Sequence, residues 1–212
     1  MARIPIGNVY PTDDYLLARC APAGFGLGVK NGHDCTDCNE AILNGTYYIF
    51  GESATNHPGN SMQYGCMDVK RRGNYITQIV HYDYYEAKRF SKDGGETWGA
   101  WEWVNPPMQV GVEYRTTERW QGKPVYYKVV DFGGLPNATT ATVPIGAENI
   151  EWAFLDLSKS WAGPASDLTT NYVSNSSGIT EMIVNSGKIS ITTNASMTGT
   201  LAYIAVKYTK KT

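Results

Sequence analysis

The residues best suited to chemistry by type and spacing are cysteines in the first third of the chain. Cys35-Thr-Asp-Cys38 has a spacing that zinc ligands adopt, and Cys20, Cys66 or His33 would have to complete such a site. Neither Cys20 nor Cys66 belongs to a second such pair, and Cys66 occupies a strand pattern as a small apolar residue does. Three interpretations stay open: reduced structural cysteines, zinc ligands or a disulfide. We favour the first and expect no metal and no cofactor.

The other residue types that support catalysis form no constellation in the sequence. His33, His57 and His81 have no nucleophile motif of serine or cysteine beside them. The adjacent carboxylates Asp13 and Asp14 would point to opposite faces of a strand. A glycan hydrolase needs two acids brought together in space, and no spacing here proposes such a pair. We therefore expect no catalytic residues and no enzyme activity.

Aromatic residues concentrate between Tyr75 and Trp103, where Trp98, Trp101 and Trp103 follow one another closely. They could pack in a core or form a platform on which a sugar ring stacks. The segment Ser91-Lys-Asp-Gly-Gly-Glu-Thr-Trp98 fits the pattern S-x-D-x-G-x-T-W and looks like an Asp-box hairpin. In this hairpin the aspartate caps turn amides, the glycine takes a positive φ and the tryptophan packs over the turn. The pattern therefore predicts a turn that stabilises the fold and has no catalytic role.

The elements that position these residues are short strands, because no window shows a sustained helical repeat of apolar residues. Alternating β-branched and aromatic residues predict an all-β protein. Asn185-Ser186-Gly187 predicts a hairpin, and the last strand should carry Leu201, Tyr203, Ala205 and Lys207 on one face. The expected strands are 46–50, 62–69, 75–82, 84–90, 97–104, 124–132, 138–143, 150–157, 179–184, 188–193 and 200–208.

Two β domains are expected, because Pro106-Pro107 interrupts the strand pattern and stiffens the backbone. We expect an N-terminal arm at 1–34, a β-meander domain at 35–105, a linker at 106–120 and an antiparallel β-sandwich or jelly roll at 121–212. The irregular stretch 158–178 should be a long loop on the second domain. Such loops usually bind something or are mobile.

Composition excludes several classes of protein. The 212 residues are 42% hydrophobic and 18% charged, as in a globular protein, and a net charge of −2 without a basic tract indicates no nucleic-acid partner. No apolar run approaches the ~18 residues of a membrane span, so we expect no membrane insertion. The N-terminus lacks the apolar region of a signal peptide, so we expect synthesis in a cytosol and release without standard secretion.

Several segments together resemble the pyocin-knob type of module found in tail fibres of bacteriophages and phage-like bacteriocins. The similarity extends over about residues 18–135, and it departs from the family where Cys38 and Cys66 replace expected aliphatic residues. The segments that carry it are Ala21-Pro-Ala-Gly-Phe-Gly-Leu-Gly28, Asp37-Cys-Asn-Glu-Ala41, Asn44-Gly-Thr-Tyr-Tyr48, Tyr75-Ile-Thr-Gln-Ile79, the turn from Ser91 to Trp101, and the stretch from Glu113 to Tyr127.

The resemblance implies a tail fibre or tail-tip protein of a virion, usually a homotrimer, assembled with other phage tail proteins in the host cytoplasm. It would bind a host-surface polysaccharide or cell-wall glycan without catalysis. The meander would then be a knob-like domain, and the C-terminal sandwich would carry the receptor contacts. The residues that we expect to bind are Trp161, Asp167, Asn171 and Tyr172, the aromatic side chains by stacking and the polar ones by hydrogen bonds. The alternatives are a tail-associated polysaccharide depolymerase and a purely structural tail or baseplate protein.

Overall fold

The structure is a computed structural model that describes residues 33–50, 54–59, 64–166, 171, 173 and 178–211. The expected arm at 1–34, including Cys20, lies almost wholly outside these residues. The described residues form fourteen strands and one 3-10 turn and contain no α-helix, which confirms the all-β prediction. None of their helical segments has the length and apolar character needed to cross a bilayer. The chain divides into two compact units, Met1–Trp101 and Glu102–Thr212.

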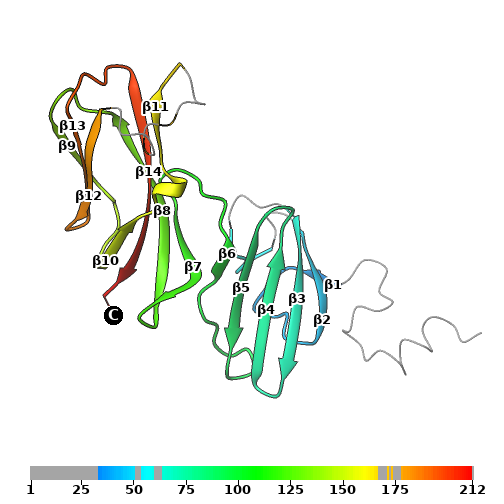
Figure 1. The fold of residues 1–212 in the computed structure, drawn as a ribbon. Helices are drawn as coiled ribbons and strands as arrows, with labels where there is room; N and C mark the ends of the chain where they lie inside the picture. The colour runs from blue at the N-terminus through cyan, green and yellow to red at the C-terminus, as the bar shows by residue number, and fades with distance from the viewer. Residues whose placement is uncertain are drawn as a thin grey trace, which may run out of the picture. The chain divides into compact units, whose positions relative to one another are not determined.

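The N-terminal unit is a β-meander that contains four of the five strands expected for it and one added strand (Figure 1). Of the fifth expected strand, 97–104, only Glu102–Asn105 forms, and it belongs to the C-terminal unit. Four successive strands pair antiparallel, and the added first strand pairs parallel with the second. Sequence alternation missed that strand because it has only three residues. In sheet order the strands are β1 (His33–Cys35), β2 (Gly45–Phe50), β3 (Tyr64–Arg72), β4 (Tyr75–His81) and β5 (Glu86–Ser91).

One face of this sheet carries the core of the N-terminal unit. The strict alternation of β3 and β4 buries every second side chain, including Met67, Ile76 and Val80. The same alternation turns Cys66 outward between buried neighbours, so the expectation that it is a small core residue was wrong. Cys38, by contrast, is fully buried in this core.

The Asp-box turn after β5 has the expected construction. Asp93 accepts hydrogen bonds from the Thr97 backbone N–H at 3.0 Å and from the Thr97 hydroxyl, and Ser91 Oγ accepts from the Gly95 N–H at 3.0 Å. Gly94 and Gly95 have φ angles of 84° and 102°. A Cβ on Gly95 would also lie 2.7 Å from Ile42 Cγ2, so glycine is required there for both reasons.

The Asp93 carboxylate should therefore stabilise the turn down to unusually acidic pH. The hydrogen bonds from Thr97 and Ser91 lower the pKa of Asp93 below its usual value. A lowered folded-state pKa gives stabilisation that is present above the unfolded pKa of about 3.9 and is lost as pH falls through the folded pKa. We expect Asp93→Asn to speed exchange of the Thr97 amide hydrogen at neutral pH, measured by NMR. The exposed Asp83→Asn is the control, and equal exchange in both variants would contradict the role of Asp93.

The C-terminal unit is a sandwich of two sheets, which confirms the predicted fold class for this half (Figure 1). The larger sheet is mainly antiparallel. In order it contains β6 (Glu102–Asn105), β7 (Glu113–Trp120), β8 (Lys123–Gly134), β14 (Thr200–Lys210) and β10 (Ile150–Leu155), and β11 (Trp161–Pro164) also pairs with β14. The smaller sheet contains β12 (Ile179–Asn185), β13 (Lys188–Thr193) and β9 (Thr140–Pro144).

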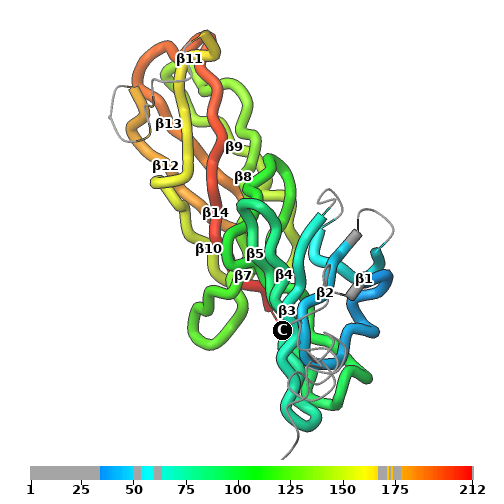
Figure 2. Tube along the Cα trace, turned by 90° about the vertical axis from the view of Figure 1, so that its right-hand side faces the viewer, coloured from blue at the N-terminus to red at the C-terminus, as the bar shows by residue number. Residues whose placement is uncertain are grey.

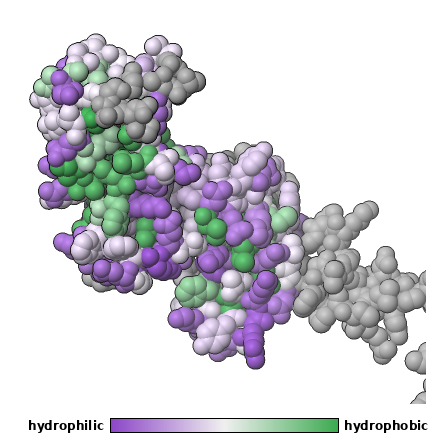
Figure 3. Space-filling model, in the orientation of Figure 1, coloured by the Kyte–Doolittle hydropathy of each residue, from purple (hydrophilic) through white to green (hydrophobic). Residues whose placement is uncertain are grey.

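Apolar side chains of the two sheets form the core between them. Alternate residues of β14, among them Ile204, Val206 and Tyr208, pack with Ile189 and Ile191 of β13. The predicted hairpin between β12 and β13 is confirmed by its register, in which Asn185 pairs with Lys188. In the view of Figure 3, a hydrophobic area lies at the side of the sandwich, between β12 and β14.

Two segments expected to be irregular contain strands. Residues 106–120, the expected linker, include β7, because the two prolines interrupt pairing only locally and the alternation resumes with the buried Tyr114 and Thr116. The division between the units falls ahead of this segment, between Trp101 and Glu102. The expected loop 158–178 includes β11, whose Pro164 is tolerated because β11 is an edge strand.

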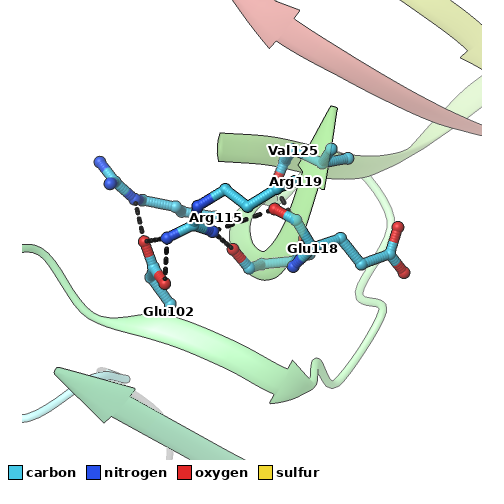
Figure 4. Close-up of polar contacts among 6 residues, drawn as sticks. Glu102, Arg115, Glu118, Arg119 and Val125 are labelled. Carbon is cyan, nitrogen blue, oxygen red and sulfur yellow. Dashed lines mark hydrogen bonds and ion pairs between the residues drawn. The ribbon is translucent and has the colours of Figure 1, made fainter. Parts of the chain in front are cut away.

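A buried carboxylate ties β6 to β7 within the C-terminal unit (Figure 4). Glu102 accepts hydrogen bonds from Arg115 Nε at 3.0 Å and from Arg119 Nη2 at 2.7 and 2.8 Å. Its side chain is 8% exposed, whereas those of the arginines are 33% and 38% exposed. The arginines keep part of their hydration, so the cluster stabilises the unit less than a fully buried ion pair would.

Neutralising this carboxylate should loosen the β6–β7 pairing. We expect Glu102→Gln to lower the free energy of local opening by about 1–2 kcal/mol, because two arginines would then face a neutral acceptor. Hydrogen exchange of peptides from β7, followed by mass spectrometry, measures this loss. The exposed Glu148→Gln in the same unit is the matched control. Unchanged β7 protection in Glu102→Gln would show that the cluster is not stabilising.

Candidate functional site

The larger sheet of the C-terminal unit has a second face that points away from the sandwich core. The alternation predicted for β14 is confirmed: Ile204 and Val206 face the core, whereas Tyr203 and Ala205 belong to a separate cluster with Tyr127. Strands β11 and β10 follow one another along β14 (Figure 2). Their register with β14 puts Trp161 and Phe154 on this face. We call it the outer face and define it by Trp161, Tyr203, Lys207, Phe154, Trp120 and Trp152.

Two aromatic rings occupy one end of the outer face. Trp161 pairs with Tyr203 in the register of β11 and β14, which puts both side chains on the same side of the sheet. Their ring centroids are 6.1 Å apart with an interplanar angle of 31°. The indole N–H of Trp161 is buried and has no hydrogen-bond partner among the described residues. A buried indole N–H usually has a hydrogen-bond acceptor. The Trp161 N–H could therefore donate to a ligand that packs against the two rings.

Charged groups lie in the middle of the outer face. Lys207 Nζ lies 2.8 Å from a carboxylate oxygen of Glu118 and 3.9 Å from one of Asp156. The hydroxyl of Tyr127 is buried without a partner in the described part of the chain. Burial raises the pKa of Tyr127, and the charges of Asp156 and Glu118 raise it further. The centre therefore combines an ammonium donor, two carboxylate acceptors and an unpaired hydroxyl.

A second aromatic group occupies the other end of the outer face. Trp120, at the end of β7, meets Phe154 of β10 edge to face with ring centroids 4.8 Å apart. Trp152 pairs with Thr209 of β14, which places it on the same face. Trp120 and Trp152 are 41% and 48% exposed, which is unusual for so large a side chain. Exposed aromatic residues at a sheet surface are typical of binding sites.

The four residues expected from sequence to bind ligand have different positions. Trp161 lies on the outer face as part of β11. Asn171 is a backbone tether: its side chain accepts from the N–H groups of Ala162 and Val173 and donates to the Ser160 carbonyl. Asp167 and Tyr172 lie outside the described residues.

Sequence reasoning did not identify the other residues of the outer face as a site. The alternation of the last strand predicts that Tyr203 and Lys207 share one face, and this pattern could have indicated part of the site. Trp152 was also placed in a strand. Trp120 lay in the expected linker, so nothing in the pattern suggested that it would meet Phe154. Only the pairing order β8-β14-β10 brings these side chains to one surface.

The tryptophans of the aromatic segment 75–103 are engaged in packing and hydrogen bonds. The Arg89 guanidinium carbon lies 4.3 Å and 4.4 Å from the ring centroids of Trp98 and Trp101. The Trp101 indole N–H donates to the Asn56 carbonyl at 2.8 Å, and Trp103 is only 6% exposed. The geometry therefore favours the core role for these residues over a sugar platform.

Comparisons with known proteins give structural neighbours of low similarity. No protein-family profile and no curated protein matches the chain. An N-truncated R2-type pyocin tail fibre structure aligns over 82% of this chain and 95% of its own, with 11% identity and a TM-score of 0.28. A C-terminal fragment of the R2 pyocin fibre of P. aeruginosa aligns over 82% of this chain and 65% of its own, with the same identity and TM-score.

Proposed function

We propose that this chain is a tail-fibre-type receptor-binding protein that holds a host-surface glycan on the outer face without altering it. The observation that carries the proposal is the arrangement of Trp161 and Tyr203 at one end of a single sheet surface, Trp152 at the other, and Lys207 between them. The setting in a phage tail comes from the sequence resemblance to the pyocin-knob type of module.

A saccharide fits this arrangement for a chemical reason. The C–H face of a sugar ring packs on an aromatic ring, while its hydroxyl groups need both donors and acceptors. Lys207 supplies the donor, and Glu118 and Asp156 supply the acceptors. From Tyr203 to Thr209 the strand rises about 20 Å, which is longer than one sugar ring. The proposed ligand is therefore an oligosaccharide or polysaccharide chain.

The carboxylates of the outer face support binding better than catalysis. Glu118 and Asp156 both lie within ion-pair distance of Lys207 Nζ, so their carboxylate oxygens face an ammonium donor. A glycosidase that works by acid catalysis needs one carboxylic acid that keeps its proton. In the proposed function both groups act only as hydrogen-bond acceptors.

The proposed setting is the tail of a virion, assembled in the host cytoplasm together with other tail proteins. A homotrimer would present three outer faces to a repetitive host polysaccharide. Linked sites gain affinity by effective concentration, so weak single contacts would suffice for attachment.

The test uses the full chain on an array of bacterial cell-wall and capsular polysaccharides, with light scattering to give the oligomeric state. We expect retention of one polysaccharide class, adsorption of the protein to cells that display it, and no released oligosaccharide. Release of oligosaccharide from the bound polymer would establish the depolymerase alternative. Failure both to bind any polysaccharide and to adsorb to cells would establish the structural alternative.

A further inference from the structure

The two cysteines of the C-x-x-C segment form a close pair inside the N-terminal unit. Cys35 ends β1 and is 4% exposed, and Cys38 lies in the following turn and is fully buried. Their sulfur atoms are 3.8 Å apart, and both thiols are free. The described residues contain no group of three or more potential metal ligands.

The backbone around the pair is held in place, so only the side chains need to move for the sulfurs to meet. The Cys38 N–H donates to the Thr55 carbonyl at 3.0 Å, and the Glu40 N–H donates to the Asp37 carbonyl at 3.1 Å. The Asp37 carboxylate accepts from the Asn39 N–H at 2.8 Å. A disulfide requires about 2.05 Å between the sulfurs. Side-chain rotation can supply the remaining approach within a four-residue segment.

The contact between the two sulfurs favours reactivity of Cys35, and a buried arginine nearby acts in the same direction. Arg89 is 6% exposed, and its Nη2 atom is buried without a hydrogen-bond partner among the described residues. Among the described residues no ion pair joins Arg89 to a carboxylate. Its guanidinium packs on the rings of Trp98 and Trp101, and its Nε donates to Gln78 Oε1. The hydrogen bond between the sulfurs lowers the pKa of Cys35. Burial and the charge of Asp37 oppose this shift, and the charge of Arg89 makes a smaller contribution that also lowers the pKa. The same hydrogen bond, with burial, raises the pKa of Cys38.

We propose that Cys35 and Cys38 are a modification site: a buried dithiol that hydrogen peroxide converts to an intramolecular disulfide. The inference does not depend on the proposed glycan binding. Peroxide is the co-reactant because it is a small molecule and Cys35 is only 4% exposed. Cys35 is the attacking residue, and Cys38 is the resolving residue.

The reaction balances in two steps. The Cys35 thiolate attacks one peroxide oxygen, the O–O bond breaks and hydroxide leaves, so that Cys35 becomes a sulfenic acid. The Cys38 sulfur then attacks the Cys35 sulfur, the S–O bond breaks and the S–S bond forms. The departing hydroxyl takes the Cys38 thiol proton and leaves as water. Two thiols are oxidised by two electrons, and one peroxide is reduced to two waters.

The test uses the full chain with Cys20→Ser and Cys66→Ser, because the exposed Cys66 would oxidise independently. After peroxide treatment the intact mass should fall by two hydrogen atoms, neither thiol should react with iodoacetamide after denaturation, and dithiothreitol should restore both. Thiols that remain alkylatable, or oxygen added to both sulfurs without a disulfide, would overturn the proposal.

Single variants in the same background test the two roles. With Cys38→Ser the disulfide cannot form, and dimedone should trap a sulfenic acid on Cys35. With Cys35→Ser, dimedone should trap a sulfenic acid on Cys38 at least tenfold more slowly, because burial disfavours the thiolate form of Cys38. Equal or reversed rates would overturn the assignment of Cys35 as the attacking residue.

Discussion

Truncating Trp161 should weaken glycan binding by about 30-fold, because the residue combines an aromatic face with an indole N–H that no described residue accepts, at one end of the outer face. Truncation of a tryptophan that contacts a ligand commonly costs about 2 kcal/mol, which corresponds to that ratio of dissociation constants. Isothermal titration of Trp161→Ala with the polysaccharide found on the array measures the change. Trp161→Phe keeps a ring for stacking and should retain most of the affinity.

Two controls separate loss of binding from loss of structure. Tyr84→Ala removes an aromatic ring that is 79% exposed in the N-terminal unit, and it should bind like the unaltered chain. Near-ultraviolet circular dichroism should show that Trp161→Ala stays folded. Unaltered affinity of a folded Trp161→Ala protein would exclude the outer face as the site, even if the chain binds glycan elsewhere.

Replacing Gln78 by leucine should cost the N-terminal unit about 3–5 kcal/mol of stability. Gln78 is fully buried, its amide donates to the carbonyls of Cys38 at 2.6 Å and Ala41 at 2.9 Å, and its oxygen accepts from Arg89 Nε at 2.8 Å. Leucine would leave two carbonyls and a buried guanidinium without these partners. Each orphaned group costs about 1–3 kcal/mol, and a charged one costs more.

Hydrogen exchange of β4 and β5 peptides reports this loss without requiring both units to unfold together. The stability loss of Gln78→Glu should be intermediate, because glutamate keeps the acceptor for Arg89 but loses the two hydrogen bonds that the Gln78 amide donates. Thr77→Val, at an exposed position on the same strand, is the control. A cost below about 1 kcal/mol for Gln78→Leu would show that the three hydrogen bonds do not hold the turn onto the sheet.

Much of the fold could be predicted because its signals are local. Alternating side chains in β3, β4 and β14 identify strands and assign their faces without knowledge of any partner. The turn residues Ser186 and Gly187 both have positive φ, as a two-residue hairpin turn requires. The Asp-box turn is also local, since Ser91, Asp93 and Thr97 bond to one another.

The missed elements depend on partners that are distant in the sequence. Strand β11 has only four residues, and it is a strand because β14 offers a free edge to Trp161 and its neighbours. Strand β1 pairs in parallel with β2, and a parallel pair has no tight turn between its strands that the sequence could reveal. Gln78 and Arg89 are polar residues on the neighbouring strands β4 and β5. Nothing in their spacing indicates that they form a buried hydrogen-bond network with the turn at Cys38.

By itself the sequence determined which residues form strands, which side of each strand is apolar and where the tight turns lie, because these properties depend on neighbours within a few positions. Tertiary structure alone decided which strands became adjacent. That choice placed Trp161, Trp120 and Trp152 on one surface and brought Arg89 to the Cys35–Cys38 pair. Such contacts depend on the free energy of packing whole sheets, which no short window of residues contains.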